Sequence, residues 1–334
     1  MKLRSGSTQA LADDGTRKGG SADRRAVAQA LADASTLICF VVLFAVLAVA
    51  SPAFLSSSNL RDVLQANAAI GIVACAGTLI VVAGGIDLSV GAIYAVAGIV
   101  SAKLAISTGV ELGILAGVGV GLALGLLNGL AVTAGGVNPF VATLASAIIF
   151  GGLAEVLAGQ QLLTPLDPSF TTLGRGAFLG IKYSVWIFAG AALILGSLLA
   201  RGRLGREAKA VGASPETARL SGISIARTQT GTYLISGVAA GIAGVLLVSQ
   251  GGQAHSNMGG FPFVLSVIAA IAVGGTRLTG GQGSIAKTVV GVLFLGLVTN
   301  GLVLLGVDPV YNQFVLGLII LAALALDRIV DREG

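Results

Sequence analysis

The stretch AAIGIVACAGTLIVVAGGIDLSVGAIYAVAGIVSAKLA (68–105) contains two long apolar runs that are interrupted once. The interruption, GGIDLSVG (84–91), places two glycines and the carboxylate of Asp87 between segments that carry no other charge before Lys103. A helix needs about 20 mostly apolar residues to cross a bilayer. The pattern therefore predicts two membrane-spanning helices joined by a break that contains an acidic residue.

The composition extends this prediction to the whole chain. Of the 334 residues, 55% are hydrophobic and 10% are charged, and the mean hydropathy is +0.94. Soluble domains carry about 25% charged residues, so this composition excludes a soluble globular protein. Only helices and closed barrels satisfy backbone polar groups in lipid, and the apolar runs are longer than the ~10-residue alternating strands of barrels. We therefore predict an all-α polytopic membrane protein.

About ten transmembrane helices are expected, with broken or re-entrant segments near 84–88 and 275–284. The apolar windows are 35–54, 65–84, 88–106, 112–133, 139–158, 183–200, 230–249, 262–275, 285–305 and 311–328. They form one transmembrane domain over 35–328. A polar, disordered tail is predicted over 1–34, and a short tail over 329–334.

The lysines and arginines predict the orientation, because they are enriched in cytoplasmic loops. If the N-terminus is cytoplasmic, sixteen of these residues lie inside and four lie outside. Both ends are then cytoplasmic. The long basic loop 201–229 lies on the same side, and the polar loop 159–182 lies on the opposite side.

Enzymatic motifs are weak in this chain. GQGSIAKT (281–288) resembles a phosphate-binding loop, but Ala286 replaces the second glycine and the stretch lies between apolar runs. Ser284 is instead predicted to cap the following helix. With one histidine and two cysteines, we expect no catalytic site, no metal site and no cofactor.

Polar residues inside apolar runs are candidates for a transport pathway. Amides suit a neutral, hydroxyl-rich solute, but the same residues can simply hydrogen-bond neighbouring helices. Asp87 has two open roles, as a cap of the third helix or as a gate. The candidate pathway or gate residues are Asn67, Gly84, Gly85, Asp87, Ser89, Asn128, Asn138, Glu155 and Asn300.

Glycine recurs at every fourth position of the fourth apolar run, which places all five glycines on one helix face. Such a face predicts close helix packing, within the chain or across a subunit interface. The five residues are Gly113, Gly117, Gly121, Gly125 and Gly129.

The cytoplasmic loop contains ASPETARLSGI (213–223), which predicts a short helix. Ser214 is the expected N-cap, Pro215 takes the first helical position and Gly222 ends the helix. Ala218 and the residues 220–223 offer an apolar contact to a partner protein. The alternative is an amphipathic segment that rests on the bilayer surface.

Three stretches together resemble a known family. GGIDLSVGAI (84–93), GREAKAVGASPETARLSGI (205–223) and VGGTRLTGGQGSIAKTVVGVLFLGLVTNGLVLLGV (273–307) are similar to the membrane subunit of bacterial ribose-type sugar ABC importers. The resemblance implies a location in the inner (plasma) membrane. It also implies a second permease subunit, identical or paralogous, a cytoplasmic subunit that binds ATP, and an extracytoplasmic solute-binding protein.

The same resemblance implies that 205–223 is the loop through which the partner ATPases drive alternating access. The matching positions are Glu207, Ala210, Gly212, Ala213, Pro215, Ala218, Arg219, Leu220, Ser221, Gly222 and Ile223. The expected function is the channel subunit of an importer for a monosaccharide or a similar neutral solute. Alternatives are an ABC permease for branched-chain amino acids or nucleosides, and an ion-coupled secondary transporter that depends on Asp87 or Glu155.

Overall fold

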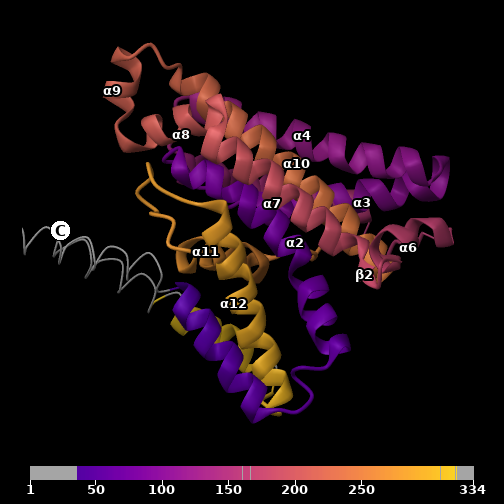
Figure 1. Ribbon diagram of the computed structural model, residues 1–334. Coiled ribbons are helices and arrows are strands. Elements are labelled where there is room, and N and C mark those ends of the chain that lie inside the picture. Colours follow the sequence, from indigo (N-terminus) through magenta and orange to yellow (C-terminus); the bar gives the residue numbers. More distant parts are fainter. Residues whose placement is uncertain (1–35, 160, 166, 309, 320, 322–334) are drawn as a thin grey trace, which may run out of the picture.

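The computed structural model describes residues 36–159, 161–165, 167–308, 310–319 and 321. The predicted tails 1–34 and 329–334 lie outside the described residues, as does most of the C-terminal half of the last apolar window. Within the described part, the chain is a bundle of helices with one small hairpin (Figure 1).

Seven helices are long and apolar enough to cross a membrane. They are α2 (Ser57–Val82), α3 (Val90–Thr108), α4 (Val110–Thr133), α5 (Pro139–Ala158), α7 (Tyr183–Arg201), α10 (Ile225–Gly251) and α12 (Ile285–Leu304). Two shorter apolar helices cover Thr36–Ala50 and α11 (Phe261–Val273). The polytopic helical fold is thus confirmed. The predicted count of about ten is not confirmed, since the described residues contain seven full-length candidates and these two shorter helices.

Two of these helices begin well before the predicted windows. α2 has 26 residues and begins at Ser57, because the side chain of Ser56 accepts a hydrogen bond from the Asn59 N–H and caps it. α10 has 27 residues and begins at Ile225, where Ser224 caps it in the same way. Both extensions are polar turns, which an apolar window misses but a capping signal identifies.

The loop predicted to lie outside contains structure that the apolar windows do not show. Asp167 caps the short helix α6 (Pro168–Arg175). The strands β1 (Ala177–Phe178) and β2 (Ile181–Lys182) pair antiparallel through a two-residue turn. Leu179 and Gly180 occupy this turn with φ angles of 53° and 75°, as a hairpin turn of this kind requires. The all-α prediction is therefore wrong for these four paired residues.

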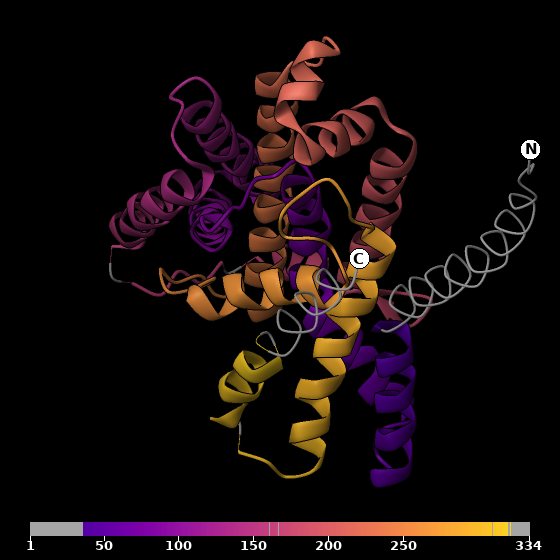
Figure 2. The same cartoon turned by 90° about the vertical axis from the view of Figure 1, so that its left-hand side faces the viewer.

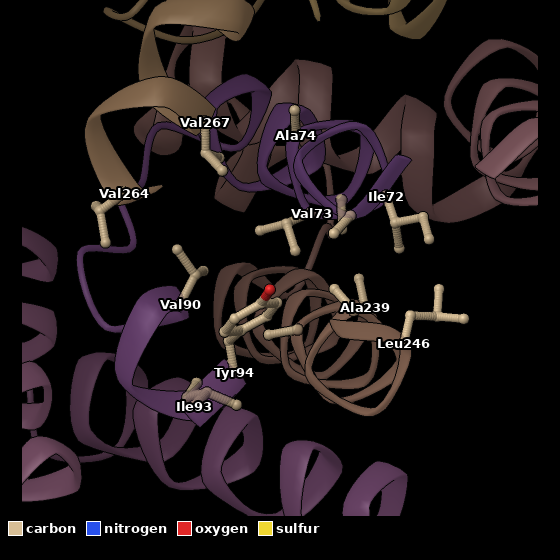
Figure 3. Close-up of a cluster of buried hydrophobic side chains, with 14 of the residues drawn as sticks. Ile72, Val73, Ala74, Val90, Ile93, Tyr94, Ala239, Leu246, Val264 and Val267 are labelled. Carbon is tan, nitrogen blue, oxygen red and sulfur yellow. The ribbon is translucent and has the colours of Figure 1, made fainter. Parts of the chain in front are cut away.

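α2 forms the centre of the bundle. Its most apolar window is 78% buried, whereas that of α7 is only 17% buried. α10, α12 and α7 pack directly against α2. Figure 3 shows part of this core, where Ile72 and Val73 of α2 face Tyr94 of α3 and Leu246 of α10. A helix that is apolar on all sides is typically enclosed in this manner.

The predicted glycine face of α4 packs inside the chain. A β-carbon added at Gly125 would lie 2.5 Å from the backbone oxygen of Tyr233, and one added at Gly113 would lie 2.6 Å from that of Ser101. The face thus contacts α10 and α3, and all five glycines are buried. The close-packing prediction is confirmed, and this face is not available as a subunit interface.

The two long predicted loops, 201–229 and 159–182, lie at opposite ends of the bundle. Figure 1 shows α8 (Arg203–Ala213) and α9 (Pro215–Leu220) at one end, and α6 and β2 at the other. This separation agrees with the prediction that 201–229 and 159–182 lie on opposite sides of the membrane. Figure 2 shows the short helix α11 running across α12, and the two helices are in contact.

Candidate functional site

The break between α2 and α3 is a defined structure. α2 ends at Val82, and Gly84 adopts a φ of +79°, which favours glycine at the turn. The backbone oxygen of Ile86 accepts hydrogen bonds from Tyr233 Oη of α10, at 3.0 Å, and from Thr143 Oγ1 of α5, at 3.3 Å. Two distant helices therefore hold the break in place.

Asp87 is 8% exposed and its carboxylate is fully engaged. Oδ1 accepts hydrogen bonds from the Ser89 backbone N–H at 2.9 Å and from Ser89 Oγ at 2.6 Å. Oδ2 accepts one from Ser236 Oγ of α10 at 3.2 Å. Ser89 Oγ in turn accepts a hydrogen bond from Asn128 Nδ2 of α4 at 2.6 Å. The carboxylate thus joins the break to α10 directly and to α4 through Ser89.

The prediction that Asp87 caps α3 is wrong, because its hydrogen bonds reach Ser89 and Ser236 and not the first N–H groups of α3. The N-cap position of α3 belongs to Ser89, whose own side chain makes no capping bond. Asp87 accepts the N–H two residues further on, which is the local turn that aspartate favours. The sequence alone does not show Ser236 and Asn128 as partners of this cluster, because they lie far from it along the chain.

The other predicted polar pathway residues have three different roles in the structure: one caps a helix, one pairs with a second amide, and two line cavities. Asn138 caps α5 by accepting a hydrogen bond from the Phe140 N–H at 3.0 Å. Asn300 and Asn59 exchange hydrogen bonds of 2.7 and 3.1 Å between α12 and α2. Asn67 instead donates only to the Val63 backbone oxygen of its own helix and lines a cavity. Glu155 is exposed at the last turn of α5, where it lines a separate cavity of about 380 Å³ together with His255.

The loop 201–229 contains the predicted short helix α9. Ser214 accepts a hydrogen bond from the Thr217 N–H at 3.3 Å, Pro215 takes the first helical position, and Gly222 has a φ of +78°. Leu220 is 84% exposed, whereas Ala218 is only 2% exposed. The predicted apolar contact therefore loses Ala218, which packs inward, and keeps Leu220.

The stretch GQGSIAKT (281–288) leads into the first turn of α12. Ser284 occupies the N-cap position of α12, but its side chain makes no capping bond, so that prediction is only half correct. Thr288 Oγ1 lies 2.8 Å from Thr78 Oγ1 in a buried contact between α12 and α2. The stretch is thus part of a helix-packing interface.

Helix α8 is held by polar contacts on its exposed side. Arg203 Nε donates to Glu207 Oε1 at 2.6 Å, and Thr228 Oγ1 of α10 donates to Glu207 Oε2 at 3.3 Å. The hydrogen bond from Arg203 lowers the pKa of Glu207 below its usual value. Glu207 therefore stays charged and ties α8 to the start of α10.

The three stretches that suggested a family meet at one point. The Gly281 N–H donates to the Val82 backbone oxygen at 2.9 Å. A β-carbon added at Gly212 would lie 2.5 Å from Gly281 N, and one added at Gly280 would lie 3.1 Å from the Gly84 Cα. We call these five residues, Val82, Gly84, Gly212, Gly280 and Gly281, the glycine junction. It joins the end of α2, the end of α8 and the loop after α11 by backbone contacts.

Comparison with known proteins identifies the family of the chain. Residues 59–324 match the family described as "Branched-chain amino acid transport system / permease component". The chain is 40% identical over 291 residues to the ribose import permease protein RbsC of Bacillus subtilis, which covers 86% of this chain and 90% of that protein.

Two further relatives come from Escherichia coli K12. The L-arabinose transport system permease protein AraH is 36% identical over 87% of this chain and 89% of its own length. The D-allose transport system permease protein AlsC is 35% identical over 89% and 92%, respectively. No solved structure matches the chain significantly. The extent of these matches shows that the chain belongs to this family of transport-system permease components.

Proposed function

We propose that this chain is the channel subunit of an ATP-driven importer for a monosaccharide. The observation that carries the proposal is the combination of family and substrate names, since the relatives at 35–40% identity are named for ribose, L-arabinose and D-allose. The solute itself is a pentose, a hexose or a close analogue. The chain is not an enzyme, and ATP is hydrolysed by a partner subunit.

The partner ATPase docks on α9 and its flanks. Leu220 is the most exposed apolar side chain of this loop, and the adjacent Arg219 is exposed as well. An apolar anchor with a basic neighbour is a suitable centre for a protein interface. The full docking and transmission set is Glu207, Ala210, Gly212, Ala213, Pro215, Ala218, Arg219, Leu220, Ser221, Gly222 and Ile223.

The glycine junction transmits the movement. When the ATPase displaces α9, α8 moves with it, and Gly212 presses directly on the backbone at Val82 and Gly281. These contacts have no flexible side chain between them that would absorb the motion. The break around Asp87 therefore moves with α8, and the bundle changes from one packed arrangement to another.

The proposed function also includes the location of the chain and its partner subunits. The chain lies in the plasma membrane with both ends cytoplasmic, pairs with a second permease subunit, and receives solute from an extracytoplasmic binding protein. The exposed apolar side chains of α5 and α7, such as Ile148 and Leu193 at 72% exposure each, face lipid or the second subunit.

Docking is tested by a mild-detergent pull-down from the native membrane, followed by an ATPase assay. Leu220→Asp is expected to reduce the recovered ATPase subunit at least tenfold, while the amount of permease is unchanged. Leu179→Asp is the matched control, because Leu179 is 78% exposed at the opposite end of the bundle. Equal recovery with both variants would reject the docking assignment.

The substrate is tested by uptake into vesicles that contain the full importer. Ribose, L-arabinose and D-allose are compared with leucine, since the family description names branched-chain amino acids. ATP-dependent uptake of a sugar supports the proposal. Uptake of leucine alone would support the amino-acid alternative, and uptake driven by an ion gradient without ATPase would support a secondary transporter.

A further inference from the structure

A cavity of about 140 Å³ lies between α2, α11, α12 and the helical residues 311–319. Of the described residues that line it, half are polar and uncharged, and the other half are apolar. The polar residues are Asn67, Ser266, Thr299, Asn312 and Gln313. From this arrangement we propose that the cavity is a binding site for the transported solute inside the membrane, and that the solute is a small, uncharged, polyhydroxylated molecule. The chemical class rests on the function proposed above, whereas the site rests on the geometry.

The cavity contains hydrogen-bonding capacity that the described residues do not use. Asn67 and Asn312 both contribute to the cavity wall. Asn67 Nδ2 donates once, to the Val63 backbone oxygen at 2.8 Å, which leaves its second N–H and its carbonyl oxygen. Asn67 can therefore offer both a donor and an acceptor to a ligand in the cavity.

The amide pair Asn59–Asn300 shows the contrast on the same two helices. Those two side chains satisfy each other across α2 and α12, and they need no ligand. Asn67 and Asn312 line the cavity without bonding each other. The chain thus uses one amide pair to fix the spacing of α2 and α12, and leaves part of the Asn67 amide unused.

Gly296 makes room for the amide of Asn67. A β-carbon added at Gly296 would lie 3.0 Å from Asn67 Oδ1 and closer still to Nδ2. Any side chain at position 296 would therefore push the amide out of its present place. The absence of a side chain here keeps the Asn67 amide in the cavity wall.

The chemistry of the lining selects the class of solute. None of the described residues that line the cavity is charged, so a carboxylate or ammonium group would enter without a counter-ion from them, which is costly inside a membrane. An amide offers both donors and an acceptor, which matches neighbouring hydroxyl groups. The apolar residues Ile70, Val292 and Leu295 provide contact for the C–H face of a sugar ring.

The size and depth of the cavity agree with this class. A volume of about 140 Å³ is below the 300–1,000 Å³ that holds a drug-sized ligand, so it suits a single sugar ring. Asn67 lies ten residues into α2, about 15 Å along a helix of about 39 Å. Transporters commonly bind their solutes near this mid-membrane depth.

The first test measures protection of an introduced thiol in the full importer. In a Cys39→Ser background, Thr299→Cys is labelled with a small methanethiosulfonate reagent in the presence and absence of ribose, L-arabinose or D-allose. We expect the transported sugar to slow labelling severalfold. Thr108→Cys, at the exposed end of α3, is the matched control and is expected to show no protection.

The second test measures uptake by Asn67→Leu and Gly296→Ala with the same importer. Loss of one hydrogen bond to an uncharged group predicts a decrease of about 2- to 12-fold in uptake, with unchanged recovery of the ATPase subunit. Asn257→Leu, at an exposed position outside the cavity, should transport as the wild type does.

The two tests distinguish failure of the proposed binding site from failure of the proposed importer function. If the wild type imports a sugar, but that sugar does not protect Thr299→Cys and Asn67→Leu transports normally, the site is refuted and the importer remains. If the wild type imports no sugar and none protects, both proposals fail. Protection without ATP-dependent uptake would support the site and refute the importer.

Discussion

Replacing Gly212 with alanine adds a methyl group where the glycine junction has no space. The new β-carbon would overlap the Val82 backbone oxygen and would lie 2.5 Å from Gly281 N. Ordinary van der Waals contact begins near 3.4 Å, so the backbones must separate to admit the methyl group. Neither neighbouring atom belongs to a side chain that can rotate away.

The cost follows from two effects. Inserting a methyl group into a close-packed site costs about 1–3 kcal/mol. The separation also breaks the hydrogen bond from the Gly281 N–H to the Val82 oxygen, which contributes about 0.5–1.5 kcal/mol. The packing between α8 and the break is therefore weakened by about 1.5–4.5 kcal/mol in total, and this contact is the one that transmits movement in our proposal.

The assay measures docking and transport separately. Gly212→Ala leaves the exposed surface of α9 unchanged, so the ATPase subunit should be recovered as with the wild type. Uptake should fall at least tenfold, and the apparent melting temperature in detergent should decrease. Gly190→Ala is the control, because a β-carbon there would meet no atom within 4 Å and alanine favours the helix.

One result would refute the reasoning. If Gly212→Ala is recovered at normal yield, melts like the Gly190→Ala control and transports like the wild type, the three segments do not contact one another as closely as described. The glycine junction could then not carry the movement from α8 to the break.

Three further predictions concern single positions. Asp87→Asn should keep most uptake, because the amide oxygen can still accept both hydrogen bonds from Ser89 and the amide N–H can donate to Ser236. Asp87→Ala should lose uptake, because it leaves buried donors unpaired at a cost of about 1–3 kcal/mol each. Equal loss of uptake in both variants would mean that the charge itself is required. Gly121→Ala should lower the melting temperature of the permease, since the added methyl would overlap the backbone oxygen of Gly237, and Gly119→Ala should not, since it meets nothing within 4 Å. The pKa of Glu207 is lowered in the folded protein, so its ionised carboxylate stabilises the fold at any pH above the pKa of glutamate in the unfolded chain, near 4.3. This stabilisation is lost as the pH falls through the lower pKa of the folded state. The melting temperature should therefore show this acid-dependent loss in the wild type and not in Glu207→Gln.

Local sequence signals predicted much of this structure. Apolar runs identified the membrane helices, because a bilayer demands long uncharged segments whatever their neighbours are. Ser214, Pro215 and Gly222 identified α9, because capping depends on a few adjacent residues. The spacing of the α4 glycines predicted a close helix contact, since helix geometry alone puts them on one face.

Only the tertiary structure decided which distant residues meet. Val82, Gly212 and Gly281 are separated by 69 residues or more along the chain, and no local pattern indicates that their backbones touch. The amides show the same limit, since Asn67 and Asn300 look alike in sequence. Asn300 finds a partner in Asn59, whereas Asn67 faces a cavity. Whether a polar group is satisfied depends on what packs beside it, and that is a property of the folded chain as a whole.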